Sequence, residues 1–279
     1  MGSPGALDWS GPFIRATVNY IDPDAADPGG IDDADRERST LKLIPHPVRV
    51  HDARPMQPGL SLEGNGFVWL RRPTAVTDFA DQDEVTRVYY REAEQVVADL
   101  TGAETVLVFG QVQRDGARRE SRHQPVYNAH VDYDVPTIRA VARRLLPPEE
   151  FERRKDQRIL LVNLWRPLAP VESAPLAVCD ASSVARRDLV YGPIGGDSAA
   201  GVPGAAGYNV AHSPMHRWCY VPAMQPDELL VLKLCDTDAD RVQWTAHTSV
   251  DPPDAPPDAR PRRSIELRTL AFIPDGRSP

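Results

Sequence analysis

The chain has 279 residues, a hydrophobic content of 41% and a formal net charge of −8. This length suits one large sheet-rich domain or two small ones, and the apolar fraction is sufficient for a buried core. The negative charge argues against a basic surface for nucleic acid, so no nucleic-acid partner is expected.

Targeting and redox features are sparse. The three cysteines, Cys179, Cys219 and Cys235, lack CxxC spacing and predict neither a disulfide framework nor a zinc knuckle. The start, MGSPGALDWS, lacks the basic and apolar regions of a signal peptide. No apolar run approaches the ~18 residues of a membrane span. The sequence therefore predicts a soluble cytoplasmic protein without a membrane partner.

The predicted elements follow in chain order. Residues 22–37 are rich in Asp, Gly and Pro and predict a loop. Residues 83–101 have helical spacing and end at Gly102, and residues 137–146 predict a second helix that ends at two prolines. Expected strands are 105–112, 159–165, 175–179, 218–221, 228–234 and 264–273. The Gly/Ala-rich stretch 192–207 predicts a mobile loop, and 251–261, with five prolines, an irregular excursion.

Short apolar runs bounded by Gly, Pro and Asp are typical of an antiparallel sandwich or barrel. The predicted helices lie in the first half of the chain and most strands in the second. We therefore expect a mainly β fold with flanking helices. Residues 1–60 would form an N-terminal extension that packs on a single core domain, residues 61–279.

The pair His130 and Asp132 is the first candidate for chemistry. In a strand, residues i and i+2 point to the same face, so both side chains can reach one metal ion. They would supply two thirds of a two-His-one-carboxylate facial triad, which leaves three adjacent positions open. An isolated HxD pair is weak evidence, because a surface His beside a solvated Asp gives the same pattern.

A second histidine, His247, lies far downstream and is followed by an arginine-rich strand. Alternation places Arg262, Ser264, Glu266 and Arg268 on one face of that strand. A guanidinium forms two parallel hydrogen bonds to a carboxylate. Arg262 with Ser264 is slightly preferred as a carboxylate anchor, Arg268 competes with it, and a salt bridge to Glu266 is the alternative for either arginine.

Ordered sequence blocks between residues 65 and 274 carry a resemblance to a known family. The blocks are YYRE (89–92), TGA (101–103), NAHVDY (128–133), VNLWRP (162–167), PLAVCD (175–180), HRWCYVP (216–222), LKLCD (232–236), AHT (246–248) and PRRSIELR (261–268). In this order they resemble the family of cephalosporin 7-methoxylase small-subunit proteins, gibberellin-desaturase-like enzymes and fungal hydroxylase/desaturase proteins of secondary metabolism.

This resemblance implies a double-stranded β-helix (jelly-roll, cupin-like) core in residues 61–279. It also implies an Fe(II) oxygenase that uses 2-oxoglutarate as cosubstrate together with O2. His130, Asp132 and His247 would be the metal ligands, and an arginine after His247 would anchor the cosubstrate. The expected reaction is hydroxylation or desaturation of a C–H bond in a small specialised metabolite, and the ligand set does not separate these outcomes from ring formation.

Several other residues are expected near this site. Asn163 and Trp165 share one strand face and are candidates for the cosubstrate site, whereas Arg166 points away and is expected to pair with an acid. Tyr127 and Tyr133 flank the ligand strand and would contact substrate or simply pack.

Three further side chains lie in strand-like segments. His216 and Trp218 are expected to be core residues, and contact with the substrate is the alternative. Lys233 lies in an apolar strand, where an unpaired ammonium would be costly, so an ion pair with a neighbouring acid is expected.

Two other functions stay open from the sequence. A cupin-like metal enzyme that does not use 2-oxoglutarate would need the ligands but no carboxylate-binding arginine. An accessory, non-catalytic subunit of a biosynthetic partner enzyme would not need the ligands. The sequence also leaves open whether the partner is such an enzyme or a second copy of the chain in a homodimer. A hydrolase is disfavoured, because there is no GxSxG motif and no cysteine in a nucleophile context.

Overall fold

A computed structural model describes residues 7–25, 31–32, 40–118, 124–195 and 201–274, and within them the strands form two sheets. The first sheet contains, in spatial order, β1 (Phe13–Ile21), β3 (Leu43–Asp52), β11 (Trp218–Tyr220), β8 (Leu176–Cys179), β13 (His247–Ser249), β6 (His130–Val131), β10 (Ala206–Val210), β9 (Leu189–Gly195) and β2 (Ile31–Asp32). The second contains β4 (Phe67–Arg71), β12 (Glu228–Asp236), β7 (Arg158–Pro167), β14 (Arg263–Ile273) and β5 (Thr105–Asp115).

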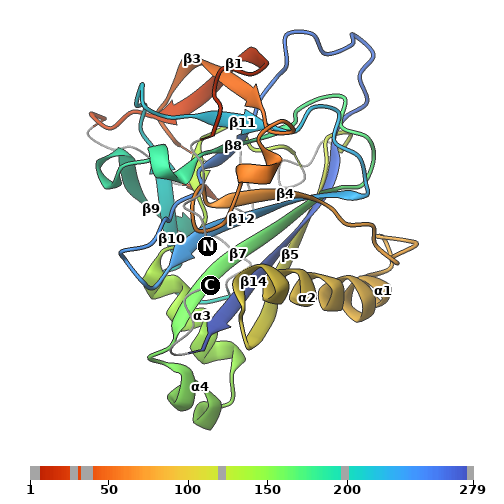
Figure 1. The fold of residues 1–279 in the computed structure, drawn as a ribbon. Helices are drawn as coiled ribbons and strands as arrows, with labels where there is room; N and C mark the ends of the chain where they lie inside the picture. Colours follow the sequence, from red (N-terminus) through yellow and green to blue (C-terminus); the bar gives the residue numbers. More distant parts are fainter. Residues whose placement is uncertain (1–6, 26–30, 33–39, 119–123, 196–200, 275–279) are drawn as a thin grey trace.

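The two sheets curl around one core, as expected for the jelly-roll prediction (Figure 1). Most neighbouring strands are antiparallel, and β3–β11 and β2–β9 are parallel pairs. The central strands β7, β12 and β14 are buried along nearly their whole length, because apolar side chains cover them on both faces.

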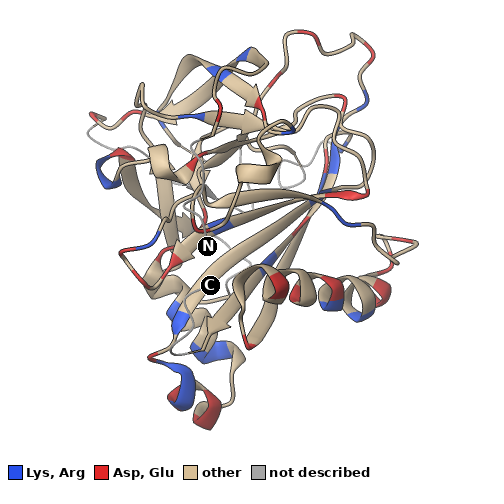
Figure 2. Cartoon of the chain, viewed as in Figure 1, with Lys and Arg blue, Asp and Glu red and all other residues tan. Residues whose placement is uncertain are grey.

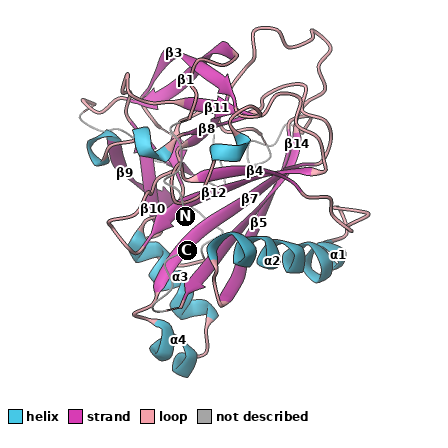
Figure 3. Ribbon diagram, in the orientation of Figure 1, coloured by secondary structure: helices cyan, strands magenta, loops and turns pink. Residues whose placement is uncertain are grey.

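The described chain contains few helices. They are α1 (Gln82–Glu84), a π-helical stretch (Val85–Tyr89), α2 (Tyr90–Thr101), α3 (Val135–Leu145) and α4 (Pro148–Arg154). The helix predicted at 83–101 is confirmed: the Asp81 carboxylate caps its start, and Gly102 ends it with a left-handed φ of 68°. Helix α2 packs against β5 and β14 on the outside of the sheet (Figure 3).

Charged residues follow this layout. Lys, Arg, Asp and Glu are frequent along α2 and α4, whereas the strand ribbons are mostly tan with a few charged positions (Figure 2). No helix in the described part of the chain is long and apolar enough to cross a membrane.

The structure contains strands before residue 60, and one predicted loop is shorter than expected. Residues 13–52 contribute β1 and β3 to the large sheet, and the boundary proposed at residue 60 stays a prediction. The Gly/Ala-rich stretch is shorter as a loop than predicted, since residues 192–195 belong to β9 and Ala206 begins β10. The predicted loop residues 196–200 lie outside the described residues.

The expected ion pair of Lys233 is confirmed. Its fully buried Nζ lies 3.2 Å from Glu63 Oε2 and 3.2 Å from Asp236 Oδ2, and Arg158 Nη2 lies 2.6 Å from Asp236 Oδ2. Breaking a buried ion pair from one side leaves charge without compensation.

We therefore expect Lys233→Met to lower the free energy of unfolding by about 3 kcal/mol in urea denaturation. Lys155→Met is the control, because Lys155 forms an exposed pair with Glu152 and its removal should leave the midpoint unchanged. Equal midpoints for both variants would show that the buried network does not stabilise the fold.

Candidate active site

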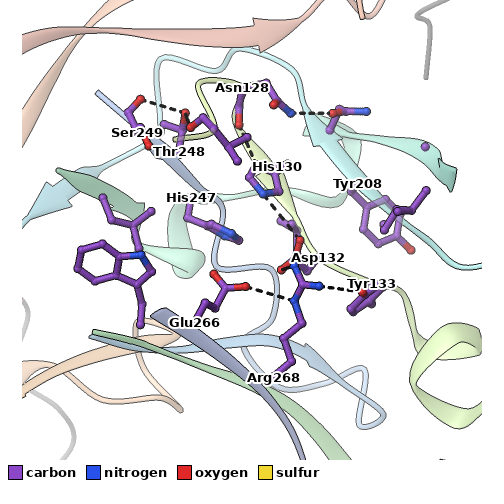
Figure 4. A pocket seen from close by; sticks show the side chains of 18 of the residues that line it. Asn128, His130, Asp132, Tyr133, Tyr208, His247, Thr248, Ser249, Glu266 and Arg268 are labelled. Carbon is purple, nitrogen blue, oxygen red and sulfur yellow. Dashed lines mark hydrogen bonds and ion pairs between the residues drawn. The ribbon is translucent and has the colours of Figure 1, made fainter. Parts of the chain in front are cut away.

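A partly enclosed cavity lies between the two sheets (Figure 4). Both sheets contribute to its wall. The lining residues are Arg114, Val126, Asn128, His130, Val131, Asp132, Tyr133, Trp165, Leu176, Gly192, Ile194, Gly207, Tyr208, Asn209, His247, Thr248, Ser249, Arg262, Glu266 and Arg268.

Strand pairing brings the three predicted ligands together. His130 on β6 lies directly opposite His247 on β13, and Asp132 follows β6. One ligand atom from each of the three residues lies within 4.8 Å of the other two. The cavity therefore contains an imidazole–carboxylate–imidazole cluster, although the three residues are up to 117 positions apart (247 − 130) in the chain.

Backbone carbonyls orient both imidazoles. His130 Nδ1 lies 2.8 Å from the Asn128 carbonyl oxygen, and His247 Nδ1 lies 3.2 Å from that of Thr245. A proton on each Nδ1 donates to the carbonyl, so Nε2 presents its lone pair to the centre of the cluster. His130 Nε2 lies 3.7 Å from Asp132 Oδ1, on the same side.

The carboxylate of Asp132 is held in its ionised form. Burial opposes ionisation, but the charge of Arg268 and the hydrogen bond from Asn163 favour the carboxylate, and the pKa of Asp132 lies below its usual range. Two neutral imidazoles and one carboxylate form the donor set of a facial triad, which suits iron(II) with three positions left for other ligands. The residues present thus fit the implied iron.

Arg262 is a buried cation that forms no ion pair with any acid in the described part of the chain. Its Nη1 donates to the Ala174 carbonyl at 2.7 Å and to Ser249 Oγ at 2.9 Å. Its guanidinium lies 5.4 Å from the ring centre of Trp165, and its Nε has no hydrogen-bond partner. No carboxylate among the described residues forms an ion pair with it, and burial together with the charge of Arg114 lowers the pKa of Arg262 to about 9. A guanidinium in this situation favours an anionic ligand.

Arg268 has a different environment. Its Nε lies 3.2 Å from Glu266 Oε1, its Nη2 lies 3.5 Å from Asp132 Oδ2, and its Nη1 donates to the Tyr133 hydroxyl at 3.1 Å (Figure 4). Acids of the protein already compensate this charge. The two arginines that the sequence leaves as rivals therefore differ clearly in what they contact.

The other predicted cosubstrate and substrate residues divide between the cavity wall and its surroundings. Trp165 and Tyr133 line the cavity. Asn163 is buried and is not a lining residue, and its Nδ2 donates to Asp132 Oδ2 at 3.1 Å. Ser264 is buried outside the set of lining residues, and Tyr127 donates its hydroxyl to Asp251 Oδ1 at 2.8 Å.

His216 and Trp218 belong to a second cluster around Tyr20. The Trp218 indole donates to the Tyr20 hydroxyl at 2.7 Å, and His216 Nε2 lies 3.3 Å from Asp188 Oδ2. Neither residue lines the cavity. The structure thus places them in packing contacts between β1, β11 and the loop before β11.

The prediction that Arg166 pairs with an acid is wrong for the described residues. Its guanidinium donates to the Tyr89 hydroxyl and to the carbonyl oxygens of Pro226 and Arg72. The two carbonyls lie just beyond the end of β4 and just before the start of β12, so Nη1 and Nη2 of the guanidinium satisfy backbone acceptors outside these strands.

Many of the lining residues had no site role predicted from the sequence, and four polar ones stand out. They are Arg114, Asn128, Tyr208 and Asn209. Asn128 could have been predicted, because it lies two positions before His130 and strand alternation places both on the same face. In the structure its Nδ2 donates to Asn209 Oδ1 at 3.2 Å. Tyr208 and Asn209 lie on β10, directly after the segment read as a loop.

Known proteins resemble this chain over most of its length. A family model described as "Oxidoreductase/YMDC permease-like domain" matches residues 18–272. The hydroxylase/desaturase efuI of Hormonema carpetanum is 30% identical and covers 95% of this chain and 96% of its own. The hydroxylase/desaturase CTB9 of Cercospora beticola is 31% identical over 82% of this chain and 76% of its own.

A solved structure shows the same fold. A variant of the iron and alpha-ketoglutarate-dependent endoperoxidase NvfI, whose sequence is from Aspergillus novofumigatus, superposes with a TM-score of 0.83 and 25% identity. The match covers 94% of this chain and 98% of that chain, which confirms the jelly-roll prediction. The chain therefore belongs to the hydroxylase/desaturase family that the order of its sequence blocks predicted.

Proposed function

We propose that this chain is an Fe(II)- and 2-oxoglutarate-dependent oxygenase that hydroxylates or desaturates a C–H bond of a small specialised metabolite. The observation that carries the proposal is one cavity that contains both the His130–Asp132–His247 cluster and the guanidinium of Arg262, which forms no ion pair with the described acids. The names of the relatives support it, since several are dioxygenases that depend on alpha-ketoglutarate.

In this proposal His130 Nε2, Asp132 Oδ1 and His247 Nε2 hold the iron. Arg262 and the Ser249 hydroxyl bind the far carboxylate of 2-oxoglutarate, and Trp165 covers the guanidinium from one side. When bound, iron(II) and 2-oxoglutarate reduce O2 and supply the oxidant for the C–H bond, with succinate and CO2 as co-products.

The chain's own contribution is placement. Tyr208, Asn209 and Ile194 line the part of the cavity contributed by β9 and β10, beside the ligand strand β6. A substrate held there presents a chosen C–H bond to the metal centre, and this orientation decides the reaction. Because both sheets line the partly enclosed cavity, they also limit the access of water to the reacting atoms.

The unpaired cation favours this reading over a cupin-like enzyme that does not use 2-oxoglutarate. An enzyme that does not bind 2-oxoglutarate would not need a buried guanidinium to bind the far carboxylate of this cosubstrate. The intact ligand cluster likewise favours catalysis over a purely accessory role. As part of the proposal we keep a cytoplasmic location and a homodimer or biosynthetic partner enzyme, which cell fractionation and size-exclusion chromatography test.

The decisive experiment is an anaerobic titration of the protein with Fe(II) and 2-oxoglutarate. We expect the weak visible charge-transfer band of a 2-keto acid chelated to iron, and slow succinate formation once O2 is admitted. Bound iron without the band and without succinate would favour the enzyme that does not use 2-oxoglutarate. Absence of iron binding would contradict the proposal and favour the accessory role.

A further inference from the structure

The two oxygens of the Asp132 carboxylate have different surroundings. Oδ1 lies 3.7 Å from His130 Nε2, on the side of the proposed metal. Oδ2 accepts a hydrogen bond from Asn163 Nδ2 at 3.1 Å and lies 3.5 Å from Arg268 Nη2. Donors of the protein therefore occupy one oxygen, while the other faces the imidazoles.

Both donors come from the sheet opposite the ligand strand. Asn163 on β7 and Arg268 on β14 are directly paired residues, whereas Asp132 follows β6 in the other sheet. The Asn163 amide oxygen is buried, and no residue that the structure describes donates a hydrogen bond to it. An unsatisfied buried carbonyl is unfavourable, so this amide is oriented by its donation to Asp132 and not by its own hydrogen-bonding needs.

Arg268 is itself fixed in place. Glu266 binds its Nε, and the Tyr133 hydroxyl accepts from its Nη1, with the guanidinium 5.4 Å from the centre of the Tyr133 ring. Tyr133 has a left-handed φ of 55°, so the chain turns sharply directly after the ligand. The turn brings Asp132 and the Tyr133 hydroxyl to the same guanidinium.

We propose that Arg268, supported by Glu266 and Tyr133, is a positioning residue that works with Asn163 to keep Asp132 a one-oxygen ligand. The inference rests on the proposed function. A carboxylate binds metal through one or both oxygens. If Oδ2 also reached the iron, it would occupy one of the three positions that the facial triad leaves for the cosubstrate and O2.

The test compares Arg268→Gln and Arg268→Lys with the wild type under anaerobic conditions at saturating Fe(II). In Arg268→Gln we expect a shifted charge-transfer band and 2-oxoglutarate affinity reduced by about 10-fold or more. Arg268→Lys, which keeps the positive charge near Oδ2, should recover part of both. Asn163→Leu should shift the band in the same direction, and it serves as the second variant if Arg268→Gln does not fold.

Arg158→Gln is the matched control. It breaks a buried ion pair with Asp236, and neither residue lines the cavity. We expect it to lower stability without any change in the band. A folded Arg268→Gln with wild-type band and affinity would overturn the inference while leaving the proposed function intact.

Lost affinity with an unshifted band in Arg268→Gln, together with normal affinity in Arg262→Leu, would also overturn the inference, because Arg268 would then be the cosubstrate anchor. Absence of the band in the wild type is a separate outcome, and it contradicts the proposed function itself.

Discussion

Arg262→Leu is expected to weaken 2-oxoglutarate binding by about 100-fold or more while iron(II) still binds. A hydrogen bond to a charged group contributes roughly 1.5–3 kcal/mol, so loss of two such bonds from one guanidinium corresponds to a factor of this size. Isothermal titration of the anaerobic iron-loaded protein with 2-oxoglutarate measures the effect, and binding of Fe(II) alone checks that the metal centre is intact.

Stability gives a second readout for the same substitution. Arg262 is buried and forms no ion pair among the described residues, so its charge is poorly compensated before the cosubstrate binds. We therefore expect Arg262→Leu to unfold at nearly the wild-type urea concentration in the absence of 2-oxoglutarate. Added 2-oxoglutarate should stabilise the iron-loaded wild type and leave the variant unchanged.

Arg166→Leu is the control for Arg262→Leu, because Arg166 is equally buried and also lacks an acidic partner among the described residues. Its donors satisfy backbone carbonyls, so the control should be less stable but should bind 2-oxoglutarate normally when folded. Unchanged affinity in Arg262→Leu would contradict the assignment of the anchor and turn attention to Arg268 and Arg114, the other arginines of the cavity wall.

Local sequence patterns were sufficient for much of the fold. The helix at 83–101 and the strand at 264–273 are long and strongly patterned, and both appear within a few residues of their expected ends. The sequence did not predict strands β1 and β3. Strand β3 contains Pro45 and Pro47, and proline is unusual inside a strand. Their partners are distant in sequence, such as β11, so only tertiary pairing reveals them.

The candidate site was predictable to the extent that it depends on strand alternation. Alternation placed His130 with Asp132 and Arg262 with Arg268 on shared faces, and both groups line the cavity. It could not decide between the arginines, since that depends on which guanidinium meets Glu266 and Asp132 across two sheets. Whether a buried guanidinium has a carboxylate beside it depends on the three-dimensional structure. Among the described residues Arg268 has such a neighbour and Arg262 forms no ion pair.

Removal of one ligand should have the largest effect of any single substitution in the cavity. We expect His247→Ala to weaken Fe(II) binding by more than about 100-fold, because even residues that only support metal ligands change affinity by 10–100-fold. Without stable iron the charge-transfer band and succinate formation should both disappear. Anaerobic equilibrium dialysis against Fe(II) measures the affinity directly.

Thermal unfolding separates lost metal binding from damaged folding. A metal ion that binds only the folded state stabilises it by about 2.7 kcal/mol at a concentration 100 times the dissociation constant. The wild type should therefore melt at a higher temperature when Fe(II) is added anaerobically. His247→Ala should fold but show no such increase at the same concentration.

His216→Ala is the matched control for His247→Ala. The His216 side chain is just as inaccessible, with 1% of its surface exposed, but it contacts Tyr20 and Asp188 outside the cavity. Its removal should lower the melting temperature and leave the increase with Fe(II) unchanged. If His247→Ala kept that increase and His216→Ala lost it, the metal would lie in the cluster around Tyr20, and the assignment of His130, Asp132 and His247 would be wrong.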